Sequence, residues 1–139
     1  MHMNAKTTMG WLLIGITLSF VTPYNFVQEG VASYYAHSLR GRPTASGALY
    51  HPDSLTAAHR YLPFGTEVVV TNTVNQRQVS VTINDRGPFR SRRIVDLSYR
   101  AADSLGIVRS GTERVVIQAK LPPEVAERVQ EKVDSLVKQ

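Results

Sequence analysis

The clearest pattern in the chain is found in two short runs, 67–72 and 78–84, that are rich in valine and threonine. In the second run Val79, Val81 and Ile83 fall on one face and polar residues fall on the other. A period of two is typical of a β-strand with one buried face. The polar residues between the runs have the length of a hairpin loop. The pattern therefore predicts two adjacent strands joined by a tight connection.

Two further segments, 29–35 and 111–120, have the same strand-like character. One short helix is predicted over 99–105, because Ser98 can cap its first amides and Gly106 can end it in the left-handed conformation. Several short strands combined with one or two short helices are typical of a small β-barrel. The predicted fold class is therefore mainly β.

A second helix is predicted near the end of the chain, in residues 122–139. Pro122 and Pro123 end the preceding strand, and a proline suits the first turn of a helix. The apolar positions then repeat at three and four residues, which predicts an amphipathic helix of about 15 residues. They are Val125, Val129, Val133, Leu136 and Val137. We expect this helix to pack on its own domain, and the alternatives are pairing with another copy or lying on a membrane surface.

The first 28 residues differ in composition from the rest of the chain. Lys6 is their only charged side chain, and an apolar run follows at 11–21. A short basic start and an apolar run of this length are typical of a secretory signal. A membrane-spanning helix needs about 20 apolar residues, so an uncleaved signal anchor would have to use 9–26. The predicted division is a signal peptide or signal anchor at 1–28, a barrel at 29–121 and a helix at 122–139.

Composition and charge narrow the possible functions. The chain has 139 residues, a net charge of +5 and no cysteine. It therefore has the length of one domain, and cysteine-based disulfides, zinc sites, nucleophiles and lipid anchors are excluded. Four arginines cluster at 86–93, which predicts a positive local potential. No nucleic-acid-binding signature accompanies them, and the histidines lack metal-ligand spacing, so we expect no nucleic acid, metal or cofactor.

The segment Asn84-Asp85-Arg86-Gly87-Pro88 is the strongest candidate for chemistry. A predicted strand ends at Asn84, and Gly87-Pro88 forces the chain to turn. Asp85 is thus expected at a rigid edge from which its side chain projects into a groove. An aspartate in that position is a candidate general acid or base. The same residues are also ordinary turn formers, so this segment alone does not decide the function.

Six short blocks, taken in order, resemble the rare lipoprotein A (RlpA) family. The resemblance covers about residues 29–120. The blocks are 30–35 (GVASYY), 44–47 (TASG), 55–59 (LTAAH), 62–66 (LPFGT), 81–89 (VTINDRGPF) and 93–98 (RIVDLS). The resemblance implies a six-stranded double-psi β-barrel, a fold that the family shares with expansins. It also implies that the glycan strand of peptidoglycan is the substrate.

The same resemblance assigns roles to particular residues. It makes Asp85 the general acid and base, and His59 the second catalytic residue, as a hydrogen-bond partner of the carboxyl group or of the sugar. A histidine satisfied inside a loop is the structural alternative for His59. The chain departs from the family at Ala48, where the pattern has a glutamate. The implied reaction is lytic transglycosylation, in which the muramoyl 6-hydroxyl attacks and a 1,6-anhydro product leaves, so that one carboxyl group can suffice.

Eight residues are expected to contact the glycan. Aromatic side chains can stack on sugar rings, and we expect the Arg86 guanidinium to point outward or toward substrate carboxylates. They are Tyr34, Tyr35, Thr44, Ser46, Asn84, Arg86, Phe89 and Asp96. Two or three aromatic residues of the barrel are expected in the core instead.

Three functions follow as alternatives. The first is a monomeric enzyme, exported to the periplasm or cell envelope, that is not a lipoprotein and is tethered to the membrane if the N-terminal segment is retained. The second is an expansin-like module that binds peptidoglycan without cleaving it, because Ala48 replaces the family glutamate. The third is a structural envelope protein whose last helix recruits a partner.

Overall fold

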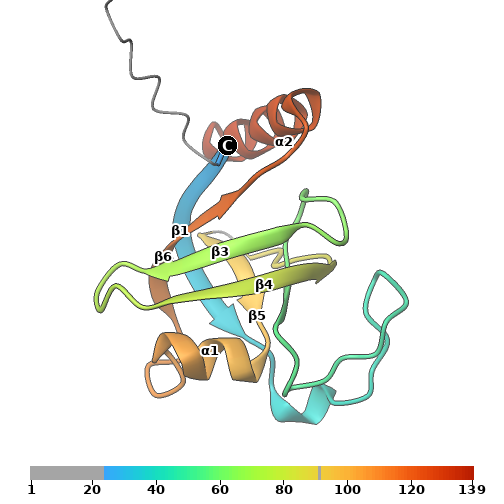
Figure 1. Ribbon diagram of the computed structural model, residues 1–139, viewed down its shortest axis with the longest axis vertical. Coiled ribbons are helices and arrows are strands. Elements are labelled where there is room, and N and C mark those ends of the chain that lie inside the picture. The colour runs from blue at the N-terminus through green and yellow to red at the C-terminus, as the bar shows by residue number, and fades with distance from the viewer. Residues whose placement is uncertain (1–23, 91) are drawn as a thin grey trace, which may run out of the picture.

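Six strands close into a barrel with one helix at each end of the barrel (Figure 1). The computed structural model describes residues 24–90 and 92–139, so positions 1–23 of the predicted leader lie outside the described residues. The strands are β1 (Phe26–Tyr34), β2 (Thr56–Ala58), β3 (Glu67–Asn72), β4 (Gln78–Asp85), β5 (Arg93–Leu97) and β6 (Glu113–Ala119). The helices are α1 (Tyr99–Leu105), α2 (Pro123–Val137) and a 3-10 turn, η1 (His37–Leu39).

The strand order around the barrel is β1-β5-β2-β4-β3-β6. The pairs β1–β5 and β2–β4 are parallel, and the other four pairs are antiparallel. The β3–β4 pair is the hairpin expected from the sequence. This arrangement confirms the six-stranded double-psi β-barrel.

The inner face of the barrel carries the apolar positions of the alternating runs. Val81 and Ile83 of β4 face inward together with Val68 and Val70 of β3, and all four are buried. Burying each such side chain contributes about 1.5–3 kcal/mol. The alternation in the sequence therefore corresponds directly to the core.

The first strand begins earlier than expected. Phe26 is 1% exposed and pairs with Ala119 of β6, and the pairing continues through Gln28. Residues 26–28, which were predicted to belong to the leader, are therefore part of the barrel. The composition of the segment could not reveal this, because the strand is defined by its backbone partners on β6.

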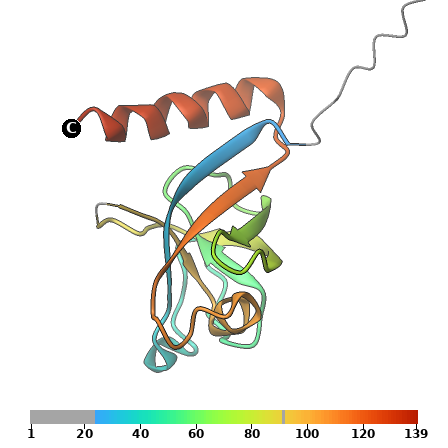
Figure 2. The same cartoon turned by 90° about the vertical axis from the view of Figure 1, so that its left-hand side faces the viewer.

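Both predicted helices are present: α1 has the expected bounds, and α2 runs from Pro123 to Val137 within the predicted 122–139. Ser98 caps α1 by accepting the Ala101 amide, and Gly106 ends it at a φ of 74°. Helix α2 is 15 residues long and lies across the end of the barrel where β1 begins and β6 ends (Figure 2). Its Val129 and Val133 are buried against the barrel. No helix among the described residues is long and apolar enough to cross a membrane.

Candidate active site

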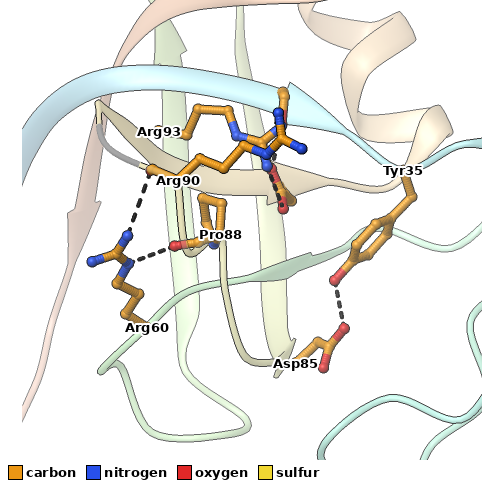
Figure 3. A network of polar contacts seen from close by, with 8 residues as sticks. Tyr35, Arg60, Asp85, Pro88, Arg90 and Arg93 are labelled. Atoms are coloured by element: carbon orange, nitrogen blue, oxygen red, sulfur yellow. Dashed lines mark hydrogen bonds and ion pairs between the residues drawn. The ribbon is translucent and has the colours of Figure 1, made fainter.

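Asp85 is the last residue of β4, and its carboxylate is held by three donors from three parts of the chain. The Tyr35 hydroxyl donates to Oδ2 over 2.6 Å. The backbone amides of Ala45 and Arg86 each donate to Oδ1 over 2.8 Å. Figure 3 shows the Tyr35 side chain reaching Asp85 from the end of β1. The position and direction of the carboxylate are therefore fixed before any ligand binds.

The barrel strands determine where Asp85 stands. Ala58 of β2 pairs with Asp85 of β4, and the pairing shifts by one residue at a bulge between Ala57 and Ala58. The backbone carbonyl of Asp85 accepts the His59 amide over 3.2 Å. Beyond the strand, Gly87 takes a φ of 115°, a conformation that side-chain-bearing residues avoid. These features end the strand one residue beyond the expected Asn84.

The loop 43–49 is shaped by its own hydroxyl groups. Thr44 Oγ1 donates to the Ala48 carbonyl over 2.7 Å and lies 3.0 Å from Ser46 Oγ. The Ser46 amide bonds the Asn84 carbonyl over 3.2 Å, which ties the loop to β4. The side chain of Thr44 is thus used within the loop, and the result is that the Ala45 amide points at Asp85.

A second carboxylate, Asp96 of β5, lies on the same face of the sheet. Ala58 pairs with Asp85 on one side and with Asp96 on the other, and residues in register on neighbouring strands project to one face. The Ser33 hydroxyl donates to Asp96 Oδ1. Arg93 Nη2 lies 3.8 Å from Asp96 Oδ2. Asp96 is therefore fixed from β1 and from its own strand.

Both carboxylates act on the pKa of the Tyr35 hydroxyl. Burial raises the pKa of Tyr35 far above its usual value, and the hydrogen bond to Asp85 and the negative charges of Asp85 and Asp96 raise it further. The ring also packs edge-on against Tyr50, with 4.8 Å between the ring centroids. Tyr35 is thus a permanent hydrogen-bond donor to Asp85.

The prediction that the His59 ring bonds the catalytic carboxyl group is wrong. The ring is 2% exposed. Nδ1 accepts the amides of Tyr61 and Leu62, each over 3.0 Å, and Nε2 lies 2.9 Å from Gln28 Oε1. Because Nδ1 accepts, Nε2 carries the hydrogen. Burial lowers the pKa of His59 to about 4, and the nearby positive charges of Arg86 and Arg60 act in the same direction. His59 is the satisfied loop histidine of the alternative interpretation.

The Arg86 guanidinium makes no ion pair with the Asp85 carboxylate among the described residues, and it contacts the 59–64 loop instead. Its Nη1 donates to the carbonyls of His59 and Leu62 over 3.0 and 2.8 Å. The guanidinium lies 4.0 Å from the centroid of the Phe64 ring, a cation–π arrangement. Burial lowers the pKa of Arg86, while the charge of Asp85 opposes this. Arg86 therefore braces the 59–64 loop with its side chain and contacts Asp85 through its backbone amide.

The remaining predicted contact residues do not form one cluster. Tyr34 donates its hydroxyl to the Val108 carbonyl over 2.9 Å and so faces the α1 side of the barrel. Asn84 Oδ1 is buried and has no hydrogen-bond partner among the described residues. Phe89 is 77% exposed and lines a groove with Arg60 and Arg92. The structure brings Tyr35, Ser46 and Asp96 into the surroundings of Asp85.

Sequence reasoning missed two parts of the site. The Ala45 amide is a backbone group, so no side-chain signal could identify it. Ser33 was present in a matched block, but its role depends on the register between β1 and β5. In the described part of the chain, no three His, Asp or Glu side chains lie close enough together to hold a metal ion.

Comparison with known proteins identifies the family. The sequence model of the lytic transglycolase family matches residues 27–117. The chain belongs to this family. The resemblance to the RlpA family that the sequence blocks indicated is thereby confirmed, and the matched region covers all six strands except the last two residues of β6 and the first of β1.

Several curated relatives bear the RlpA name. The probable endolytic peptidoglycan transglycosylase RlpA of Treponema pallidum is 46% identical over 111 residues, which are 80% of this chain and 35% of that protein. The corresponding protein of Nostoc is 53% identical over 92 residues, 65% and 25% of the two chains. The endolytic peptidoglycan transglycosylase RlpA of Haemophilus influenzae is 46% identical over 95 residues, 68% and 33%. This family member thus spans a quarter to about a third of these relatives.

Two solved structures share the barrel. The Streptomyces papain inhibitor has a TM-score of 0.57 and 21% identity, and the match covers 71% of this chain and 98% of that chain. The apo-expansin of Clavibacter michiganensis has a TM-score of 0.55 and 22% identity, with 70% and 52% covered. At this level of identity the similarity extends to the fold alone.

Proposed function

We propose that this chain is an endolytic peptidoglycan lytic transglycosylase that cleaves the MurNAc–GlcNAc bond and forms a 1,6-anhydro product, with Asp85 as general acid and base. The observation that carries the proposal is the Asp85 carboxylate at the strand end, held by Tyr35 and two backbone amides. The family assignment and the names of the three relatives support the substrate and the reaction class.

The hydrogen bonds indicate which carboxylate oxygen carries the proton. A carboxylate has about four acceptor positions, two on each oxygen. Both positions on Oδ1 are used by the amides of Ala45 and Arg86, and Tyr35 uses one on Oδ2. Among the described contacts, the remaining position is on Oδ2. The proton that Asp85 delivers is therefore assigned to Oδ2.

The reaction then proceeds in two proton transfers. Asp85 gives its proton to the glycosidic oxygen as the bond between that oxygen and C1 of the muramoyl sugar breaks. The 6-hydroxyl of the same sugar attacks C1 and forms the new C1–O6 bond, and its proton returns to Asp85. No water is consumed and no protein nucleophile is needed, in contrast to hydrolytic glycosidases with two carboxyl groups.

Asp96 has a supporting role in this proposal. Its carboxylate lies on the same sheet face as Asp85, and its charge acts on the Tyr35 hydroxyl. A negative charge near the site favours the positive charge that develops at C1 in the transition state. Tyr35, Ser46, Asn84 and Asp96 are accordingly our candidates for glycan contacts beside Asp85. Tyr34, Thr44 and Arg86 are assigned structural roles instead.

The second candidate function is a glycan-binding module without turnover. It is favoured by Ala48, which occupies the loop that contacts Asp85 through Ala45. In either case we propose an exported, monomeric protein of the periplasm or cell envelope that acts on peptidoglycan glycan strands. An uncleaved N-terminal segment would add a membrane tether.

Product analysis separates the two candidates. The full chain is incubated with purified sacculi, and the soluble fragments are examined by mass spectrometry. The enzyme releases fragments that end in 1,6-anhydromuramic acid, which are lighter by one water than hydrolytic products. A binding module co-sediments with sacculi and releases nothing, and reducing-end products would instead indicate a hydrolase.

A further inference from the structure

A groove of about 820 Å³ lies between the barrel and the last turns of α2, apart from Asp85. Its floor is the segment 28–31 of β1, and one wall is formed by 92–94 at the start of β5. Val133, Leu136 and Val137 of α2 cover it. Figure 2 shows the C-terminal half of α2 extending over this side of the barrel, above the β4–β5 connection.

The polar lining of the groove is strongly basic. Arg60, Arg92, Arg93 and Arg114 line it, whereas Glu29 is the one acidic side chain in the lining. Glu29 is paired with Arg114 over 3.0 Å, and Arg93 is paired with Asp96. Arg92 makes no ion pair with any residue that the structure describes. The groove therefore retains an excess of positive charge that an anion can neutralise.

The backbone of Arg92 is held in an unfavourable conformation. Its φ is 74°, in the left-handed region that non-glycine residues seldom occupy. The Arg92 carbonyl accepts the Val31 amide over 3.1 Å, which ties this conformation to β1. Such strain is concentrated at functional positions.

Two apolar side chains that line the same groove are exposed to solvent. Phe89 on the β4–β5 connection is 77% exposed, and Val137 at the end of α2 is 84% exposed. Both line the groove. Arg60 lies over the Phe89 ring, 5.9 Å from its centroid. Large apolar residues beside unpaired arginines are typical of a surface that meets both acyl chains and charged headgroups.

We propose that this groove and its rim are a docking site for an anionic phospholipid surface. The guanidinium groups bind the headgroup phosphates, and Phe89 and Val137 enter the boundary between headgroups and acyl chains. The acidic side chains Glu127, Glu131 and Asp134 of α2 line a different groove, beside Asn25. We therefore expect the molecule to bind with its basic groove, and not with that acidic groove, toward the anionic surface. The proposal goes beyond glycan cleavage and does not depend on it.

Vesicle binding by the full chain tests the arginines. Partition is measured by co-sedimentation with phosphatidylglycerol vesicles and with phosphatidylcholine vesicles. In the ratio of the two partition coefficients, any charge-independent contribution of the N-terminal apolar run cancels. Each arginine near an anionic surface contributes about fivefold to partition. We expect a ratio well above ten at low salt that falls in 0.5 M salt by about tenfold or more.

Arg90 is exposed on the rim of the groove, directly after Phe89, and its carbonyl accepts Arg60 Nη2. The double variant R90Q and R92Q should reduce this ratio by more than about tenfold. The matched control is R109Q with R128Q, which removes the same charge from exposed positions outside the groove. For the apolar part, Phe89→Ser should lower absolute partition into phosphatidylglycerol vesicles, and Val74→Ser, an exposed valine in the β3–β4 hairpin, should not. Thermal unfolding of each variant identifies any loss of folding.

Three results would overturn the proposal. The first is a ratio near one for the wild-type chain, and the second is an equal loss in the control variant. The third is a groove variant that binds vesicles normally but loses binding to peptide-bearing sacculi and keeps binding to glycan strands stripped of peptides. That outcome would assign the groove to acidic peptides instead. Glycan cleavage is not a readout in either assay, so the two proposals fail independently.

Discussion

Asp85 depends on the Tyr35 hydroxyl more than on any other side chain. The hydrogen bond between them is 2.6 Å long, and Tyr35 remains protonated because burial and two neighbouring carboxylates raise its pKa. A hydrogen bond to a charged group contributes about 1.5–3 kcal/mol. Its loss would leave Oδ2, the proton-carrying oxygen of Asp85, with no donor among the described contacts, while the two amides still hold Oδ1.

Tyr35→Phe should therefore lower the rate of anhydro-product release by about 10- to 100-fold. Tyr34→Phe is the matched control, since Tyr34 is the preceding residue and bonds the Val108 carbonyl. It should reduce stability but leave turnover per folded molecule within about threefold. Initial rates on sacculi, normalised to folded protein, provide the comparison. Equal rates for Tyr35→Phe and wild type would remove Tyr35 from the site.

His59 makes the stability of the fold dependent on pH. Its pKa is about 4 in the folded protein and about 6.5 when unfolded. The unfolded chain therefore binds the extra proton first as the pH falls, and stability is lost between about pH 6.5 and pH 4. The difference corresponds to about 3 kcal/mol.

The variant His59→Asn tests this assignment, because the asparagine carbonyl oxygen can still accept the amides of Tyr61 and Leu62 but does not titrate. The free energy of unfolding in urea should fall by about 3 kcal/mol less between pH 7 and pH 4 in this variant than in wild type. His51→Gln, at an exposed position, serves as the control. Parallel pH curves for wild type and His59→Asn would contradict the assignment.

At the scale of elements, the sequence predicted the strands that alternate and missed those that do not. Strand β4 was found because its period of two reports the core face directly. Strand β2 has only three residues, and β5 lies beside the arginine cluster. The family resemblance implied six strands but did not place these two, because their strand character comes from pairing across the barrel.

The same distinction applies to the candidate site. The turn residues after β4 indicated Asp85, but the partners of Asp85 come from β1 and from the 43–49 loop, which only the closed barrel brings together. His59 and Arg86 were matched to the family by sequence order. In the structure their side chains bond backbone groups of the 59–62 loop. The spacing of residues along the chain does not predict these contacts.

Helix α2 behaves as part of the domain, as its buried valines indicate. Val129 is buried between the helix and the barrel, whereas Val137 is exposed. Val129→Ala should lower the free energy of unfolding by about 2 kcal/mol, because two methyl groups are lost and a cavity remains. Val137→Ala should change it by less than about 0.5 kcal/mol. Urea unfolding measures both, and equal effects would mean that the helix does not pack as the structure describes.

At the scale of the whole molecule, the barrel brings together, around the carboxylate of Asp85, groups from segments that are distant in sequence. Tyr35 comes from the end of β1, Ala45 from the loop before β2, and Asp85 from β4. Asp96 joins them through the shared partner Ala58. The lining of the basic groove under α2 does not include Asp85, and Arg93, which lines the groove and pairs with Asp96, connects the two surfaces.

The most direct test of the central claim is the release of 1,6-anhydro-muropeptides from purified sacculi by Asp85→Asn compared with wild type. The amide keeps the size of the side chain but cannot give and take the proton, so release should fall by at least about 1,000-fold while binding to sacculi persists. Asp53→Asn, at an exposed aspartate paired with Arg40, should retain wild-type release. Undiminished release by Asp85→Asn would contradict the assignment of Asp85 as the acid and base.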